Sequence, residues 1–170
     1  MWDVNKETDN LWVSVADITS NEGRDIVSTK EHISECAAQK MHIVPQGSLL
    51  MSFKLTIGKM AFAGKNLYTN EAIIAIPDDG CYKLRFLYYY LSSYNWDTLT
   101  VGAEKVKGKT LNKSSISRIK LPIISLSDQQ QIAEQLDKIS AKIHALQSNF
   151  DTTVTLCNDL KQSILKDIFG

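Results

Sequence analysis

The sequence is poor in cysteine and proline, and it has no long apolar run. Among its 170 residues, Cys36, Cys81 and Cys157 lie far apart and form no C-x-x-C pair. This scattered, odd set predicts reduced thiols and argues against a disulfide framework or a zinc site. No stretch approaches the roughly 18 apolar residues that a membrane span needs, and no apolar signal region follows Met1. We therefore expect a cytoplasmic protein with no membrane partner.

The motifs of common enzyme classes are also missing. Gly108-Lys109-Thr110 ends like a phosphate-binding loop, but Ala103 stands where G-x-x-x-x-G-K-[ST] needs its first glycine. Metal-ligand spacing is absent from the three histidines, His32, His42 and His144. The sequence lacks G-x-S-x-G, H-E-x-x-H and the glycine and proline motifs of a DNA methyltransferase. We predict a chain that is not an enzyme, with no catalytic residue, no metal and no cofactor of its own.

The charge is balanced overall but uneven along the chain. The formal net charge is zero, yet residues 102–120 contain six basic side chains against one acid, a local balance of +5. Because electrostatic footprints are local, a neutral protein can still present a phosphate-binding face. The lysines that we expect to form such a face are Lys105, Lys107, Lys109 and Lys113. Alternatively, these lysines belong to a solvated surface loop, or to an exposed strand edge that they protect from aggregation.

The chain divides into a mixed domain, residues 1–126, and a helical part, residues 127–170. Short apolar or alternating runs predict strands at residues 12–15, 49–53, 57–63, 71–76 and 119–123. Helical spacing predicts helices at residues 34–40 and 82–95, and Asn112 predicts the cap of one more helical turn. The expected fold class is α+β, with a globular domain followed by a long C-terminal helix.

The helical part carries a regular apolar pattern. Ser127 and Gln130 have the S-x-x-Q form of a capping box, and no glycine or proline follows until Gly170. Apolar and weakly polar residues then recur at alternating steps of four and three, the heptad seam of a coiled coil. The seam consists of Ile132, Leu136, Ile139, Ile143, Leu146, Phe150, Thr153, Cys157, Leu160 and Ile164. A helix of about 42 residues would span roughly 60 Å, more than the width of a small domain.

The seam requires a surface to cover it. Its eight strongly apolar side chains, all but Thr153 and Cys157, could each gain about 1.5–3 kcal/mol on burial. A lone monomer offers no place to bury them, so we predict that these eight form the interface with a partner helix. The alternative is an ordinary helix packed on its own domain.

Several stretches resemble the specificity subunits of Type I restriction–modification systems. Residues 12–18, WVSVADI, resemble the family's early W-[VI]-x-[IV]-x-D-[IL] strand. Residues 44–52, VPQGSLLMS, with Ile57-Gly58, are similar to its V-P-x-G hairpin, and Thr69-Asn70 matches the T-N before the next strand. Residues 121–132 are similar to the junction that precedes the conserved helix, and residues 160–165, LKQSIL, to its end.

The resemblance implies a non-catalytic DNA-recognition subunit. Full-length members of this family contain two recognition domains, each followed by a long helix, and the helices pair antiparallel. They bind modification subunits, which methylate adenine with S-adenosylmethionine, and restriction subunits can join to cleave DNA. A chain with one such unit resembles a half-subunit that restores the arrangement as a homodimer. A two-fold dimer makes a palindromic split site on double-stranded DNA the natural target.

Further DNA-binding residues are expected in the recognition domain. Lys54 and Lys59 flank the Ile57-Gly58 turn and could extend the phosphate-binding face. The expected base-reading side chains are those of Thr56, Arg24 and Asn66. The rival hypothesis is a coiled-coil assembly adaptor, or a competitor of an intact specificity subunit, which dimerises without binding DNA.

Overall fold

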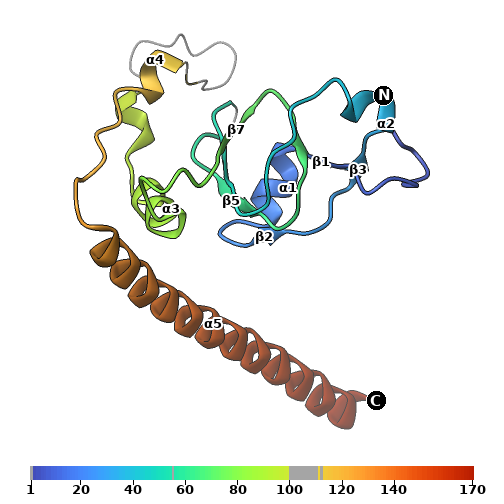
Figure 1. Cartoon of the computed structure of the whole chain (residues 1–170). Coiled ribbons are helices and arrows are strands. Elements are labelled where there is room, and N and C mark those ends of the chain that lie inside the picture. Colours follow the sequence, from blue (N-terminus) through green and yellow to red (C-terminus); the bar gives the residue numbers. More distant parts are fainter. Residues whose placement is uncertain (1, 55, 100–110, 112) are drawn as a thin grey trace. The chain divides into compact units, whose positions relative to one another are not determined.

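The computed structural model describes residues 2–54, 56–99, 111 and 113–170, with only the backbone described for residues 113 and 114. The chain forms two compact units, residues 1–130 and 131–170, which are described separately (Figure 1). The strands are β1 Leu11–Val13, β2 Asp25–Ile26, β3 Glu31–His32, β4 Leu49–Ser52, β5 Met60–Ala63, β6 Tyr68–Thr69 and β7 Ile73–Ile76. The helices are α1 Val15–Ser20, α2 Glu35–Ala38, α3 Leu84–Ser92, the 3-10 helix η1 Trp96–Leu99, α4 Lys113–Ile116 and α5 Leu126–Phe169.

A mixed sheet with the strand order β2-β5-β4-β7 forms the centre of the first unit. β4 pairs antiparallel with β5 and with β7, while β2 runs parallel to β5. The strand sequences LLMS, MAFA and IIAI are almost continuously apolar. Such runs are typical of strands that are buried on both faces.

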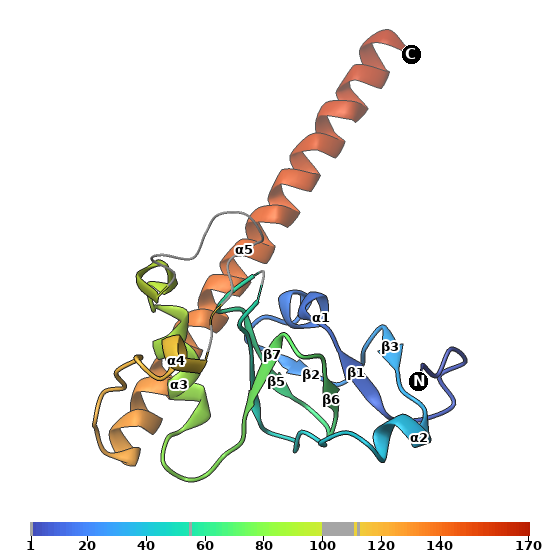
Figure 2. The same ribbon diagram turned by 90° about the horizontal axis from the view of Figure 1, so that it is seen from above.

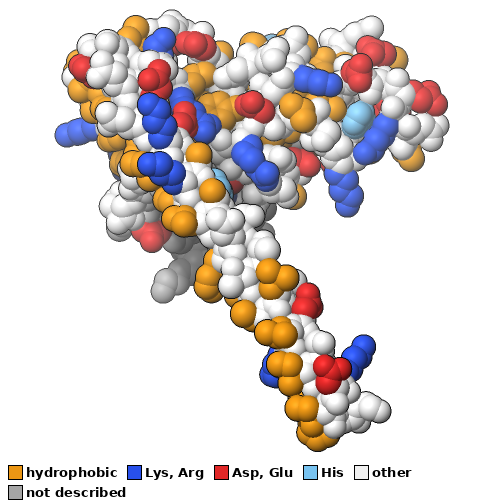
Figure 3. Space-filling model, turned by 90° about the horizontal axis from the view of Figure 1, so that it is seen from below, with side chains coloured by type: hydrophobic (Ala, Val, Ile, Leu, Met, Phe, Trp, Pro, Cys, Tyr) orange, Lys and Arg blue, Asp and Glu red, His pale blue; other side chains and the backbone are white. Residues whose placement is uncertain are grey.

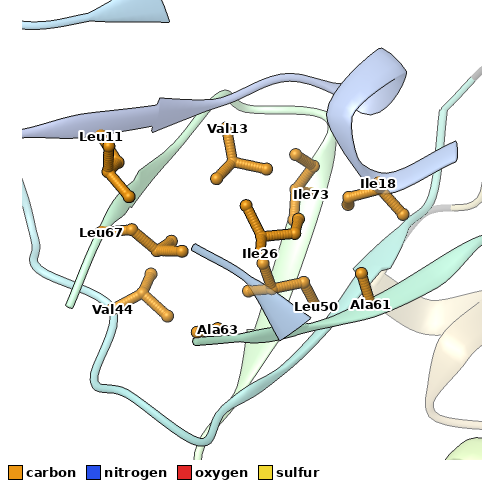
Figure 4. Packing of buried hydrophobic residues seen from close by; sticks show 10 residues of the cluster. All are labelled: Leu11, Val13, Ile18, Ile26, Val44, Leu50, Ala61, Ala63, Leu67 and Ile73. Carbon is orange, nitrogen blue, oxygen red and sulfur yellow. The ribbon is translucent and has the colours of Figure 1, made fainter. Parts of the chain in front are cut away.

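One face of this sheet packs into the main hydrophobic core. Alternate residues of β4, β5 and β7 point to this face, as the two-residue period of a strand requires. Figure 4 shows them meeting the side chains of β1, α1 and the loops around them. The cluster consists of Leu11, Val13, Ile18, Ile26, Val44, Leu50, Ala61, Ala63, Leu67 and Ile73.

Helix α3 covers the opposite face. Leu87 and Leu91 are buried against the remaining side chains of β4 and β5, which are Leu49, Met51, Met60 and Phe62. Residues 84, 87, 88 and 91 recur at the spacing of one helix face, which is the pattern from which a helix at residues 82–95 is predicted. That prediction is confirmed.

A smaller sheet with the order β3-β1-β6 extends the first unit. β1 runs parallel to β6 and antiparallel to β3 (Figure 2). Leu11 and Val13 face the main core, while Trp12 packs on the other side with Ile33, Ala38 and Tyr68. Ala38 belongs to α2, so the predicted helix at residues 34–40 is confirmed as a short one.

The expected strand at residues 12–15 is wrong at its end. The chain leaves β1 at Val13 and enters α1 at Val15, with Ser14 as the N-cap. The Ser14 hydroxyl accepts a hydrogen bond from the Asp17 N–H at 3.3 Å, and the Asp17 carboxylate accepts one from the Ser14 N–H at 2.8 Å. This reciprocal capping box outweighs the alternation of Trp12 to Val15.

The expected strand at residues 119–123 is also wrong. These residues have no regular secondary structure, Ile119 and Leu121 pack individually against the α3 cluster, and Ile123 is 97% exposed. Pro122 has no N–H with which to pair in a sheet. The predicted strands at residues 49–53, 57–63 and 71–76 are confirmed in shorter form. A helical turn, α4, follows Asn112, which itself lies outside the described residues.

Helix α5 confirms the long C-terminal helix and completes the predicted α+β fold. Its cap differs from the prediction, because Ser125 takes the place expected for Ser127. The Ser125 hydroxyl donates to the Asp128 carboxylate at 2.6 Å and accepts from the Asp128 N–H at 3.1 Å. Figure 3 shows apolar side chains along this helix towards its C-terminal end. In the described part of the chain, no helix combines the length and apolarity needed to span a bilayer.

Candidate nucleic-acid interface

The turn between β4 and β5, described at residues 53, 54 and 56–59, is held from within by Ser52. The buried Ser52 hydroxyl donates to the carbonyl oxygen of Thr56. The hydroxyl oxygen of Ser52 also accepts a hydrogen bond from the Lys59 N–H at 3.2 Å. The Gly58 N–H donates to the Ser52 carbonyl at 2.9 Å. These bonds fix a turn that carries three of the predicted DNA-binding residues, Lys54, Thr56 and Lys59.

Trp96 of η1 fixes the same turn from outside. Gly58 has a φ of +81°, a left-handed conformation that glycine adopts without strain. Its Cα also faces the Trp96 indole so closely that a Cβ there would lie 2.6 Å from Trp96 Cε2. Trp96 in turn packs against the α3 cluster. The turn is therefore positioned by glycine's missing side chain and by a helix that lies far from it in the sequence.

A second loop, residues 21–24, lies beside the beginning of β5. The Gly23 N–H donates to the Met60 carbonyl at 2.9 Å, and the Phe62 N–H donates to the Arg24 carbonyl at 2.9 Å. Lys59 forms an ion pair with Glu22 at 2.7 Å. This contact brings Arg24 and Lys59, which are 35 residues apart in the sequence, onto neighbouring segments.

Arg85 of α3 holds the second loop in place. Its guanidinium donates to the Gly23 carbonyl at 2.7 Å. The guanidinium carbon lies 5.2 to 5.5 Å from the ring centroids of Phe62, Tyr88 and Tyr89, within the range of cation–π attraction. Sequence reasoning missed Arg85 and Trp96, because their roles depend on contacts with loops that are distant along the chain.

The side chains of this region are available to a charged ligand. Arg24 and Thr56 are exposed, and Lys54 and Lys59 are half-buried. The Lys59–Glu22 pair is about 40% exposed on both sides, at 41% and 42%. Exposed ion pairs contribute at most about 1 kcal/mol, so Lys59 can exchange Glu22 for a phosphate at little cost. We name this set, Arg24, Lys54, Thr56 and Lys59, the hairpin face.

Asn66 does not join the hairpin face. Asn66 is exposed in the loop after β5, at the opposite end of the β4–β5 hairpin, where its side-chain oxygen accepts from the Gln46 N–H at 2.9 Å. Lys105, Lys107 and Lys109 lie outside the described residues. Lys113 begins α4, and its side chain is likewise not described. The DNA-binding role of every residue in this set stays a prediction.

The described residues show no arrangement for metal chemistry. Within the described ranges, no group of His, Cys, Asp or Glu side chains is placed to hold a metal ion. The three cysteines are free and exposed.

The predicted dimer-interface residues form an exposed stripe on α5. Leu136 is half-buried, and the other seven are between 38% and 68% exposed. A stripe of this kind is available to a partner helix.

Comparison with known sequences identifies the family. A family model described as the Type I restriction modification DNA specificity domain matches residues 3–164. The specificity subunit of the Type I restriction enzyme EcoprrI of Escherichia coli is 31% identical over 140 residues, covering 76% of this chain and 35% of the relative. That of MjaIX from Methanocaldococcus jannaschii is 27% identical over 132 residues, covering 74% and 30%. The chain thus spans about a third of the length of these relatives.

Comparison with solved structures shows the same fold. One match has a TM-score of 0.68 at 20% identity and covers 94% of this chain and 38% of the matched chain. That chain comes from a structure described as the structural basis underlying complex assembly and conformational transition of the type I R-M system. The HsdS subunit of Thermoanaerobacter tengcongensis matches with a TM-score of 0.59 at 15% identity, covering 86% and 33%.

The named relatives are all specificity subunits of Type I restriction enzymes, which confirms the predicted family. The match is continuous across both compact units, from the N-terminal sheet to the last turns of α5. The chain therefore belongs to the family of Type I restriction modification DNA specificity domains.

Proposed function

We propose that this chain reads one half of a split DNA site and directs a partner adenine methyltransferase to it. The observation that carries the proposal is the match of the DNA specificity domain to residues 3–164, which includes both the globular unit and most of α5. The methyl donor is S-adenosylmethionine, bound by the modification subunit, and this chain binds no cofactor. Restriction subunits join the same complex.

DNA is held through phosphates and read through base edges. Lysine and arginine side chains fix the register of a protein on the duplex, while side chains that reach the major groove distinguish the bases. The hairpin face supplies both kinds of group on a rigid support, because Ser52 and Trp96 fix its turn. Lys105, Lys107, Lys109 and Lys113 add phosphate contacts from their own segment. With roughly five such contacts per domain, log affinity should fall with log salt at a slope of about −4 to −5.

A second copy of this chain completes the site. The seam of α5 leaves large apolar side chains exposed, among them Leu146 and Phe150 at 68% each. Burial of such a side chain contributes about 1.5–3 kcal/mol, so several of them suffice to hold two helices together. Two copies would present two recognition domains related by a two-fold axis, and their natural target is a palindromic split sequence.

Methylation mapping tests the proposal. The chain is co-expressed with the modification subunit encoded beside it, and host DNA is sequenced for 6-methyladenine. We expect a new split, palindromic motif. An asymmetric split motif would show that a different recognition domain has joined, and no new methylation by a folded, subunit-bound chain would contradict a recognition role.

Two variants separate the parts of the proposal. Alanine at Lys105, Lys107 and Lys109 should abolish both methylation and DNA binding, whereas alanine at three exposed lysines elsewhere, Lys30, Lys40 and Lys138, should preserve both. Leu146→Glu should abolish dimerisation and methylation together, while DNA binding by the single domain persists in weaker form. The rival adaptor function predicts instead that the first variant changes nothing and that the unaltered chain dimerises without selecting a DNA sequence.

A further inference from the structure

The seam of α5 has a polar residue at each end. Gln129 lies three residues before Ile132, and Asp167 lies three residues after Ile164, so each occupies the next position of the seam. Gln129 is only 1% exposed, and its amide is already engaged, since its oxygen accepts from the Lys83 N–H at 2.8 Å and its nitrogen donates to the Ile124 carbonyl at 3.1 Å. Asp167 is exposed and acidic. The apolar seam therefore runs from Ile132 to Ile164 and is bounded by one polar residue at each end.

The spacing of the seam residues is symmetric about the midpoint of this stretch, Ser148. The steps of four and three that connect the ten seam residues are symmetric, so each seam residue has a counterpart at an equal distance on the other side of Ser148. The pairs are Ile132 with Ile164, Leu136 with Leu160, Ile139 with Cys157, Ile143 with Thr153, and Leu146 with Phe150. Even the polar limits, Gln129 and Asp167, are equidistant from it.

We propose a register for the antiparallel helix pairing that the family resemblance implies: its two-fold axis lies beside Ser148. This register rests on the proposed homodimer. In it, the seam residue at each position contacts its counterpart from the partner, and Ile139 faces Cys157 of the partner subunit. All ten seam positions are then covered.

The two weak seam residues favour this arrangement over a parallel one. A parallel pair in register would place Thr153 against Thr153 and Cys157 against Cys157, which gives two successive layers without a large apolar side chain. The antiparallel register gives each of them an isoleucine instead. The Thr153 hydroxyl donates to the Asn149 carbonyl at 2.9 Å within its own helix. It therefore needs no partner across the interface, and its methyl group can pack against Ile143 of the partner subunit.

The residues beside the axis are suited to meet their own copies. Gln147 and Asn149 flank Ser148 on either side of the seam, and each would face the same residue of the partner. A charged side chain there would repel its copy, but an amide can donate to and accept from another amide. The nearest flanking lysines, Lys142 and Lys161, lie across from Leu156 and Ala133, so no like charges meet.

Registers shifted by one heptad are less favourable. A shift in one direction places Leu136 opposite Asp167 and leaves Ile132 beyond the seam of the partner. A shift in the other direction does the same to Leu160 and Ile164, with Leu160 opposite Gln129. Either shift leaves two large apolar side chains uncovered, a loss that the register centred on Ser148 avoids.

Cysteine cross-linking tests the register. Cys36 and Cys81 are replaced by serine, which leaves Cys157 as the sole thiol of the chain. Under mild oxidation this background should stay uncross-linked, and the added substitution Ile139→Cys should yield a covalent dimer. Ile143→Cys in the same background is the matched control, which should not cross-link because its counterpart is Thr153. Covalent dimer from Cys157 alone would establish a parallel pair and overturn the proposal, as would preferential cross-linking of the control.

A second variant preserves every seam residue. With all three native cysteines replaced by serine, Gln147→Cys should join to its own copy through a short thiol-reactive cross-linker. Ser140→Cys, on the same flank, should not, because its own copy lies about 24 Å away at 1.5 Å per residue. Sedimentation of the unmodified chain separates the two proposals. A dimer without these cross-links overturns the register alone, while a monomer overturns both the register and the proposed homodimer.

Discussion

Replacing Gly58 with alanine should destabilise the domain by more than backbone strain alone. An L-residue at the left-handed φ of +81° costs about 1–2 kcal/mol. The new Cβ would also lie 2.6 and 2.7 Å from Cε2 and Cδ1 of Trp96, too close for any real contact, so the indole must move. Truncating a fully buried tryptophan costs about 3–5 kcal/mol, and Trp96 is half-buried. Its partial displacement should therefore add about 1–2 kcal/mol.

Gly47 provides a matched control for this prediction. It has a similar φ of +85°, but nothing lies within 4 Å of the position that its Cβ would occupy. Gly47→Ala should therefore show the backbone strain without the displacement of a neighbour. Urea unfolding at one fixed chain concentration gives both free energies, and the near-ultraviolet circular dichroism of tryptophan should change in Gly58→Ala alone. Equal losses in the two variants, within about 0.5 kcal/mol, would refute the reasoning, as would an undiminished penalty for Gly58→Ala in a Trp96→Ala background.

Three further predictions concern Gln129 at the beginning of α5, the hairpin face and the N-terminal loop. Gln129→Ala should lower the free energy of unfolding by about 1–3 kcal/mol in urea titrations, because it removes the acceptor of the Lys83 N–H; a change below about 0.5 kcal/mol would contradict this. Arg24→Ala and Lys59→Ala should each reduce the salt slope of DNA binding by about one, whereas uncharged Asn66→Ala should leave it unchanged, and an unaltered slope in the first two would remove them from the phosphate contacts. The Thr8 N–H lowers the pKa of the Asp3 carboxyl below its ordinary value. The stability that the Asp3 carboxylate contributes is therefore present above about pH 3.9 and is lost as the pH falls further. Asp3→Asn should flatten the plot of unfolding free energy against pH in that range, and parallel plots for the variant and the unaltered chain would contradict this prediction.

The central sheet is predictable from sequence because its strands are apolar on both faces. LLMS is buried throughout, IIAI is buried at its first residue and half-buried at the other three, and each is bounded by turn residues, such as Gly47 before β4 and Pro77 after β7. The same rule fails at residues 119–123, where Ile119 and Leu121 fill gaps beside α3 as individual side chains. Periodicity reports that a residue is buried, but it does not report whether the backbone pairs with a neighbouring strand.

The wrong strand end at Ser14 and the wrong N-cap of α5 have a common cause. Ser14 with Asp17, and Ser125 with Asp128, use an aspartate at the third helical position. The expected form with glutamate or glutamine draws attention to Ser127 and Gln130 instead. Ser125 and Ser127 lie two residues apart, and each begins a capping pattern. The structure uses Ser125 as the N-cap, and Gln129 is then buried.

The candidate interface is only partly predictable for a different reason. Lys54, Thr56 and Lys59 are neighbours in the sequence, so their proximity follows from a single turn. The approach of Arg24 to Lys59 depends on the parallel pairing of β2 with β5. The roles of Arg85 and Trp96 depend on side chains that cross between elements more than 30 residues apart. Such contacts leave no periodic trace in a single sequence.

The exposed seam also bears on how much of this protein a cell can accumulate. An isolated helix gains little stability in water without a tertiary partner, and a partner that binds only the folded form stabilises it by mass action. At low concentration, α5 would fray and become accessible to proteases, whereas at higher concentration, association would protect it. In the homodimer proposed above, the number of protected chains would thereby be set by the number that pair.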